Sequence, residues 1–158
     1  MTDLHAYQIQ AVKKLGIAPI SKITDSIYLG SVGSTDPEVL KHYKITHVIN
    51  AAKEIDYHNK QIIIVRLNMD DVPEENLFRV LEPSRIVIKR ILESDPRNRV
   101  LVHCMAGVSR SASVVIYFLM KEKGLTFQQA LDMVERKRPV VNPNIGFTKT
   151  LKEVEKIK

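Results

Sequence analysis

The stretch Val100-Leu-Val-His-Cys-Met-Ala-Gly-Val-Ser-Arg-Ser-Ala-Ser113 contains the chain's only cysteine, Cys104, and it decides how the rest of the sequence is interpreted. Three apolar residues open it and predict a short buried strand. In the small-residue run that follows, Gly107 has the backbone freedom that a tight loop needs. From Arg110 onward the pattern is helical. The stretch therefore predicts a strand, a tight loop and a helix start in direct succession.

A loop of this kind directs consecutive backbone N–H groups at one concavity, which suits a tetrahedral anion such as phosphate. Helix N termini and nearby cations also favour the thiolate form of a cysteine. Arg110 can hold two phosphate oxygens with its planar guanidinium, better than a lysine could. A thiolate below a bound phosphate can attack phosphorus and form a phosphocysteine. We therefore predict Cys104 as nucleophile and Arg110 as phosphate clamp; the alternative is that Cys104 is a small buried hydrophobic residue.

Composition limits the class of protein. The chain has 158 residues and is 44% hydrophobic, which suits one globular domain. No apolar run is long enough to span a bilayer, so no membrane anchor is expected. A single cysteine excludes an internal disulfide and favours a reducing compartment, cytoplasmic and/or nuclear.

The net charge of +6 favours anionic partners such as phosphorylated proteins. The basic residues are scattered among acidic ones, however, and form no block with interleaved aromatics. No nucleic-acid partner is therefore expected. The five histidines show no metal-ligand spacing, so we predict neither a metal nor another cofactor.

Two parts are expected along the chain. Residues 1–20 form an N-terminal segment that is predicted to be helical, because apolar residues recur at helical spacing until Gly16 and Pro19 end the pattern. This helix is expected to cover the domain edge, and a homodimer through the segment is an open alternative. Residues 21–158 form the predicted catalytic domain.

The predicted fold class is α/β. Short strands are expected at 22–29 (two strands), 46–51, 61–67 and 100–102, and helices at 34–43, 77–92, 111–121, 126–137 and 145–157. Thr126 and Gln129 form a capping box. Pro83 is unfavourable inside a helix, so we expect either a kink there or a helix that begins near it.

A phosphocysteine mechanism also needs a proton donor for the leaving oxygen and a base for the second step, and one carboxyl group can serve both roles. Asp70 and Asp71 are the candidates, in an acidic loop just before the long helix. The alternative is that both cap that helix or lie in a solvated turn.

The sequence His103-Cys104-x5-Arg110-Ser111 resembles the His-Cys-x5-Arg-Ser signature of the cysteine-dependent protein phosphatases. The resemblance extends to Ile27-Tyr-Leu-Gly, to the strand at 45–50 and to Asn142-Pro-Asn-Ile-Gly-Phe, in the family's order. The chain looks like a small, atypical dual-specificity phosphatase. The resemblance implies a protein tyrosine phosphatase-like fold, with a central mixed, mostly parallel sheet flanked by helices. It also favours Asp71 over Asp70 as the acid, because Asp71-Val-Pro-Glu-Glu-Asn-Leu fits the family's frame.

Further roles follow for the residues around the signature. The Ser111 hydroxyl can donate to the sulfur and stabilise the departing thiolate; its alternative role is helix capping. By resemblance, His103 orders the loop and favours the thiolate, and Asn144 supports the loop. The predicted phosphate-binding residues are Met105, Ala106, Gly107, Val108, Ser109 and Arg110.

The leading hypothesis is metal-free hydrolysis of phosphotyrosine and phosphoserine/threonine on proteins. A phosphoinositide or RNA 5′-phosphatase is the second hypothesis. Family members that act on lipids tend to carry lysine within the loop, where this chain has Met105, Ala106 and Val108. A non-catalytic phosphopeptide-binding module is the third, although Cys104, Arg110 and Asp71 are all present.

Overall fold

The computed structural model describes residues 2–157. Its elements are short strands and helices. In chain order they are α1 (Asp3–Lys13), β1 (Ile20–Lys22), β2 (Ile27–Gly30), the 3-10 helix η1 (Val32–Thr35), α2 (Pro37–His42), β3 (His47–Ala52), β4 (Ile63–Met69), α3 (Phe78–Ser94), β5 (Val100–His103), α4 (Arg110–Lys123), α5 (Phe127–Lys137) and α6 (Ile145–Glu155).

The five strands form one sheet in the order β1-β2-β5-β3-β4. Only the β1–β2 pair is antiparallel, so the prediction of a mixed, mostly parallel sheet flanked by helices is confirmed. β5 lies at the centre, with Val102 opposite Leu29 on one side and Ile49 on the other. Since parallel strands end at the same edge, the segment after β5 emerges beside those after β2 and β3.

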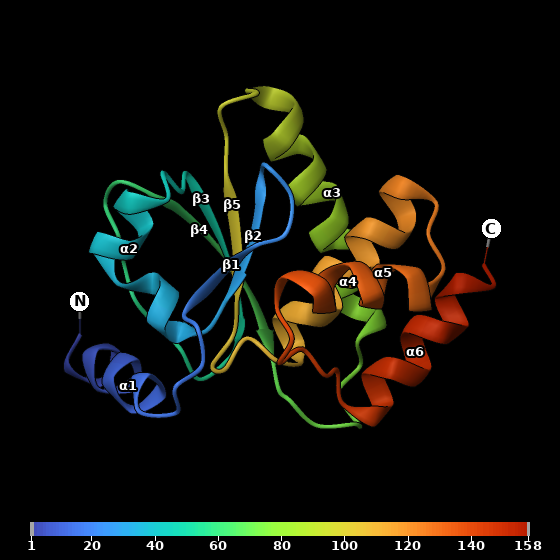
Figure 1. The fold of residues 1–158 in the computed structure, drawn as a ribbon, viewed down its shortest axis with the longest axis horizontal. Coiled ribbons are helices and arrows are strands. Elements are labelled where there is room, and N and C mark those ends of the chain that lie inside the picture. Colours follow the sequence, from blue (N-terminus) through green and yellow to red (C-terminus); the bar gives the residue numbers. More distant parts are fainter. Residues whose placement is uncertain (1, 158) are drawn as a thin grey trace.

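Helices cover both faces of the sheet (Figure 1). α3, α4, α5 and α6 lie on one side, and α1 and α2 lie on the other. Every residue of α4 from Arg110 to Met120 is buried, and this helix contacts β2, β3 and β5. Gly124, with φ of 63°, ends α4 in a left-handed cap. This helix is thus packed against the three middle strands of the sheet, with its N terminus near the carboxyl end of β5.

The course of α3 differs from one of the two expectations. The helix begins at Phe78 and continues through Pro83, so a start near Pro83 is wrong. Proline removes one backbone donor, whose acceptor would be the Arg79 carbonyl. The buried face of α3 continues across Pro83, from Val80 to Ser84 and Ile88, and its packing offsets the single lost bond.

The predicted N-terminal helix is present as α1, but its buried face is not simply apolar. The side chains that it buries are His5, Gln8, Ile9 and Val12. Leu4, Tyr7 and Leu15, which contribute to the apolar pattern, are exposed. Within residues 2–157, no helix has both the length and the apolar character needed to cross a bilayer.

Candidate active site

Three segments meet at the lower end of the sheet in Figure 1. They are the loop from Cys104 to Arg110 after β5, here called the cysteine loop, the acidic loop after β4, and the start of α6. Asn144 joins all three, because its backbone N–H donates to Ser109 Oγ at 2.9 Å and its Nδ2 donates to Asp71 Oδ1 at 3.0 Å. The structure therefore brings together residues that are far apart in the sequence.

The carbonyl groups of the cysteine loop determine which way its backbone faces. Those of residues 104–109 all accept hydrogen bonds from surrounding groups. The donors are, in order, His103 Nδ1, the Val32 amide, Arg138 Nη2, Arg138 Nε, and the amides of Asn142 and Ser113. Because the C=O and N–H of a trans peptide point in opposite directions, the amides of residues 105–110 face the inner side. That is the orientation an anion site needs.

Cys104 is buried, and its sulfur lies 3.0 Å from Ser111 Oγ. Ser111 occupies the first turn of α4, so a helix N terminus and a hydroxyl both lie beside the sulfur. Each favours negative charge there. The arrangement suits a sulfur that alternates between nucleophile and leaving group.

His103 lies behind the cysteine and is fully buried. Its Nδ1 donates to the Cys104 carbonyl at 3.2 Å, since a carbonyl can only accept. Its Nε2 therefore accepts from the Tyr57 hydroxyl at 2.8 Å. Burial lowers the pKa of His103 to about 4, despite the opposing hydrogen bond to the Cys104 carbonyl. At neutral pH the imidazole is uncharged, so it orders the loop by hydrogen bonding rather than by charge.

The guanidinium of Arg110 is held in place by Glu54. Nη1 and Nη2 donate to the two carboxylate oxygens of Glu54 at 2.5 and 2.7 Å, and Nη1 also donates to the Met69 carbonyl at 3.0 Å. Burial opposes the charge on Arg110, but the Glu54 hydrogen bonds leave its pKa above the ordinary value. Nε is buried and has no hydrogen-bond partner among residues 2–157. The edge that carries Nε is thus left for an anion.

The two candidate acids have different surroundings. Asp71 accepts from Asn144 through one oxygen, and it lies close enough to Arg110 to raise the pKa of that arginine. Asp70 forms an exposed ion pair with Lys53, 3.7 Å away. Asp71 is therefore the carboxylate that is tied to the cysteine loop.

A close backbone contact holds the acidic loop against α6. A Cβ atom at Gly146 would lie only 2.1 Å from the Pro73 carbonyl oxygen. Only glycine permits this approach, because the obstructing atom belongs to the backbone. The position of Asp71 therefore depends on a glycine more than seventy residues later in the chain.

Arg138 supports the outer side of the cysteine loop, although it is 1% exposed. Nε and Nη2 donate to the carbonyls of Gly107 and Ala106, and Nη1 donates to Ala18 O and Ser21 Oγ. Burial lowers the pKa of Arg138, while the nearby Cys104 raises it. The residue places a positive charge beside the loop and ties the loop to the segment before β1.

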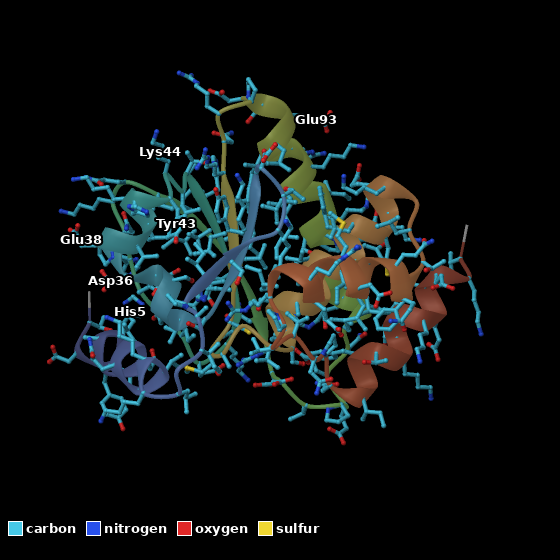
Figure 2. The ribbon with its side chains drawn as sticks, in the orientation of Figure 1. His5, Asp36, Glu38, Tyr43, Lys44 and Glu93 are labelled. Carbon is cyan, nitrogen blue, oxygen red and sulfur yellow. The ribbon has the colours of Figure 1, made fainter. Side chains whose placement is uncertain are left out.

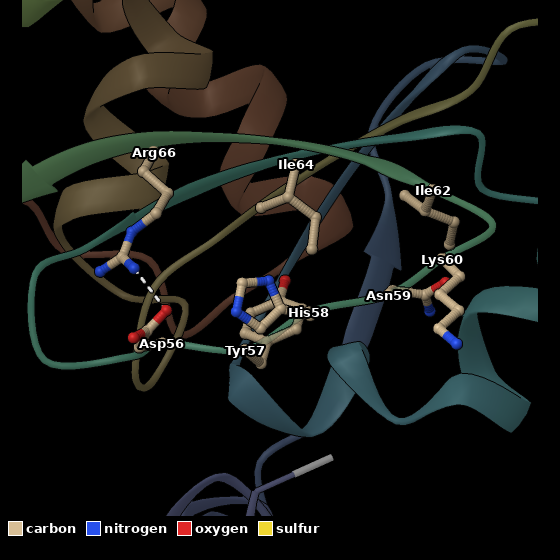
Figure 3. Close-up of a pocket in the computed structure, with 8 residues that line it drawn as sticks. All are labelled: Asp56, Tyr57, His58, Asn59, Lys60, Ile62, Ile64 and Arg66. Carbon is tan, nitrogen blue, oxygen red and sulfur yellow. Dashed lines mark hydrogen bonds and ion pairs between the residues drawn. The ribbon is translucent and has the colours of Figure 1, made fainter.

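An open pocket of about 430 Å³ lies elsewhere, between the connection that follows β3 and the edge strand β4 (Figure 3). Asp56 and Arg66 form an ion pair at one end, and Ile62 lies towards the other. None of the predicted catalytic residues lines it. Tyr57 connects this pocket to the site, because its hydroxyl reaches His103.

The chemistry that the site offers is anion binding. Backbone amides and a positioned arginine can bind a phosphoryl group against Cys104, and Asp71 can exchange a proton nearby. Among residues 2–157, no three His, Cys, Asp or Glu side chains gather as metal ligands do. The expectation of metal-free catalysis stays a prediction.

Comparison with known proteins identifies the family. The model of the dual specificity phosphatase catalytic domain matches residues 27–157. The chain belongs to this family. It is 36% identical to "Dual specificity protein phosphatase 1" of Arabidopsis thaliana over 138 residues, covering 86% of this chain and 69% of that protein. The solved structure of DUSP15 superimposes with a TM-score of 0.83 at 28% identity, covering 88% of each chain.

Some relatives are much longer than this chain. It is 38% identical to the Dictyostelium discoideum "Probable rhodanese domain-containing dual specificity protein phosphatase" over 140 residues, covering 87% of this chain. It spans only 29% of that relative. The family match begins at Ile27, so α1 and β1 lie outside it.

Sequence reasoning missed Glu54, Tyr57 and Arg138. Glu54 is 56 positions from Arg110, and Tyr57 is 46 from His103. Neither has a local signal, because each acts through a contact made only in the folded chain. For Arg138 the one available signal is its place between a predicted helix and Pro139, which indicates a loop and no contact with the site.

Proposed function

We propose that this chain is a dual-specificity protein phosphatase that hydrolyses phosphotyrosine and phosphoserine/threonine through a phosphocysteine intermediate. The observation that carries the proposal is the cysteine loop, whose carbonyls turn outward while its amides, Cys104 and Arg110 face one site. Membership of the dual specificity phosphatase family supports the same reaction.

The proposed mechanism has two displacements. The Cys104 thiolate attacks phosphorus, the bond to the substrate oxygen breaks, and Asp71 donates its proton to that oxygen. The Asp71 carboxylate then removes a proton from water, which attacks the phosphocysteine. The sulfur–phosphorus bond breaks, inorganic phosphate leaves, and the Ser111 hydroxyl donates a hydrogen bond, without giving up its proton, to the departing Cys104 thiolate. The loop amides and Arg110 stabilise the charge on the phosphoryl oxygens in both steps.

The alternative substrates are phosphoinositides and RNA 5′ ends. A polyphosphorylated ligand would gain from additional cations in the loop, but Met105, Ala106 and Val108 provide none. A non-catalytic binding module would not require the acid, whereas Asp71 is tied to the cysteine loop through Asn144.

A substrate panel tests the proposal. Phosphate release is measured with phosphotyrosine, phosphoserine and phosphothreonine peptides, with phosphoinositides and with triphosphate RNA. The expected result is release from the peptides, and none with Cys104→Ser, which should still bind phosphopeptide. Turnover of lipid or RNA alone would contradict the protein-phosphatase proposal, and turnover of peptide by Cys104→Ser would contradict the nucleophile assignment.

Four predictions about the chain's organisation are proposals too. They are the division at residue 20, the cytoplasmic or nuclear location, the absence of a nucleic-acid partner, and a homodimer through the N-terminal segment. The exposed side chains of Leu4 and Tyr7 on α1, and of Leu15 two residues beyond its end, support the last of these. Light scattering of the full chain and of Tyr7→Glu would test the homodimer, which should separate in the variant.

A further inference from the structure

The back of the site is formed by one short segment, the connection that follows β3. Within it, Glu54 binds the guanidinium of Arg110, and Tyr57 donates to His103, which in turn binds the Cys104 carbonyl. Two other residues of the segment form exposed ion pairs. Lys53 pairs with Asp70, and Asp56 pairs with Arg66. The position of this segment therefore affects both the arginine and the cysteine.

Helix α1 contacts both of these supporting residues. The His5 ring stacks on the Tyr57 ring, with centroids 4.3 Å apart and planes at 12°. Gln8, one turn later, donates from Nε2 to the Glu54 carbonyl at 3.0 Å. Figure 2 shows His5 on the side of α1 that faces the segment carrying Asp36. One face of α1 therefore contacts both Tyr57, which supports the cysteine loop through His103, and Glu54, which orients Arg110.

His5 is also fixed from its other side. Its Nε2 lies 2.7 Å from Thr35 Oγ1, and the Thr35 hydroxyl itself donates to the Val32 carbonyl. Thr35 must therefore accept, so the His5 hydrogen is on Nε2. Since His5 is only 2% exposed, its ring has little freedom to leave the Tyr57 stack.

We propose that His5 and Gln8 are positioning residues for catalysis, through two separate arms. In the first arm, His5 holds Tyr57 so that the Tyr57 hydroxyl keeps His103 and the Cys104 carbonyl oriented. In the second arm, Gln8 holds the Glu54 backbone so that the Glu54 carboxylate keeps Arg110 oriented for phosphate. The inference rests on the proposed function, but each arm also has a readout that requires no catalysis: alkylation of Cys104 for the first and affinity for inorganic phosphate for the second.

The two arms predict different defects. Losing the first loosens the backbone around Cys104, so the thiol should react with iodoacetamide more slowly at a given pH. Losing the second loosens Arg110, so the site should bind inorganic phosphate more weakly and the KM should rise. If α1 were only a cover for the domain edge, its loss would lower the melting temperature without separating these readouts.

The experiment uses the full chain with His5→Ala, His5→Phe, Gln8→Ala and, as a matched control on the exposed face of α1, Gln10→Ala. Iodoacetamide inactivation is followed from about pH 5 to pH 8, which includes the upper part of the range in which reactive thiols titrate. The inhibition constant of inorganic phosphate, kcat and KM are measured with an aryl phosphate. Thermal unfolding sets a temperature at which every variant is folded.

His5→Ala should shift the inactivation profile to higher pH and lower kcat about threefold to tenfold, the range that one ordinary hydrogen bond supplies. His5→Phe keeps the stacked ring and should behave as the unaltered chain. Gln8→Ala should raise the KM and the phosphate inhibition constant about threefold, with an unchanged inactivation profile. Gln10→Ala should change none of these quantities.

Equal behaviour of all four variants and the unaltered chain would overturn the proposal. So would a kcat loss in His5→Phe as large as in His5→Ala, because the ring stack would then be irrelevant. If His5→Ala does not fold, His5→Leu, which fills the space without a ring, takes its place in the inactivation profile, and Gln8→Ala still decides the second arm through the phosphate constant. If the unaltered chain hydrolyses no phosphate ester, the proposed function fails, while alkylation and phosphate affinity, measured by calorimetry, still test the two arms.

Discussion

Arg110, at the end of the cysteine loop, and Arg138, which packs against that loop, are both buried, but their surroundings differ. The two terminal nitrogens of Arg110 meet the carboxylate of Glu54, and its Nε has no partner among residues 2–157. Arg138 donates from all three nitrogens, to three carbonyl groups and one hydroxyl, and none of these partners carries a charge. Arg110 is thus oriented with its Nε donor unused, whereas every side-chain nitrogen of Arg138 is hydrogen-bonded to another part of the chain.

The difference separates two tasks. A residue that binds substrate must keep donors unused in the free protein, and Glu54 allows this by orienting Arg110 from the far side. A residue that shapes the loop must instead satisfy the outward carbonyls, since an unpaired buried carbonyl is costly. We therefore expect changes at the two arginines to separate activity from stability.

Of the changes at the two arginines, Arg110→Lys should give the larger loss of activity. Lysine cannot supply the planar pair of donors, so kcat/KM should fall about 10²–10³-fold. The free energy of unfolding should change by less than about 1 kcal/mol, because Glu54 is half exposed and water can solvate it. Steady-state kinetics and urea unfolding measure the two quantities. A variant that kept kcat/KM within about tenfold would contradict the clamp role.

Arg138→Met should show the reverse pattern. It leaves the carbonyls of Ala18, Ala106 and Gly107 without their donor, so the free energy of unfolding should fall by about 2–4 kcal/mol. Activity should fall only about tenfold at a temperature where the variant is folded. Arg138→Lys, which keeps the charge but not the fork, should be intermediate in stability. Lost activity with unchanged stability would instead place Arg138 among the substrate-binding groups.

Acidification should destabilise the fold, because His103 is held uncharged beside the two arginines. The pKa of His103 is about 4 in the folded chain and 6.5 in the reference state, so the unfolded chain binds the extra proton between these values. The free energy of unfolding should therefore fall as the pH drops from 6.5 towards 4, in total by on the order of 3 kcal/mol. Burial also lowers the pKa of His5 and His47, which act in the same direction.

Urea unfolding at several pH values measures this slope, and His103→Gln provides the control. The variant should lose a large part of the slope between pH 6.5 and 5, in the window where His103 is protonated only when unfolded. An identical slope in the variant would mean that His103 is not a buried neutral imidazole.

Much of the fold could be predicted because its signals are local. The capping box at Thr126 and Gln129 forms as expected, and so does the succession of strand, loop and helix around Cys104. Family resemblance supplied the sheet architecture, which neither periodicity nor spacing specifies. The sequence does not predict whether α3 begins before or at Pro83. The cost of a proline is visible locally, whereas the burial of Val80 and Ile88 that offsets it is a tertiary effect.

The candidate site divides in the same way. Cys104, Arg110 and Ser111 are close in sequence, so the geometry of a helix start was enough to predict their proximity. Glu54 and Arg138 reach the loop from distant segments, through contacts that no sequence pattern encodes. His5 shows the limit most clearly, since helical periodicity predicts α1 but not that α1 buries the polar side chains of His5 and Gln8.

The central claim is that Cys104 carries the phosphoryl group between two displacements. Ser111→Ala removes the hydroxyl 3.0 Å from the sulfur and should slow the second displacement more than the first. Rapid acid quench of this variant with an aryl phosphate, followed by mass spectrometry, should give a burst of product and a phosphorylated Cys104. Ser113→Ala, which removes a hydroxyl from the same helix, should give no such accumulation. A linear time course with no phosphorylated cysteine, or phosphate on another residue, would contradict the account.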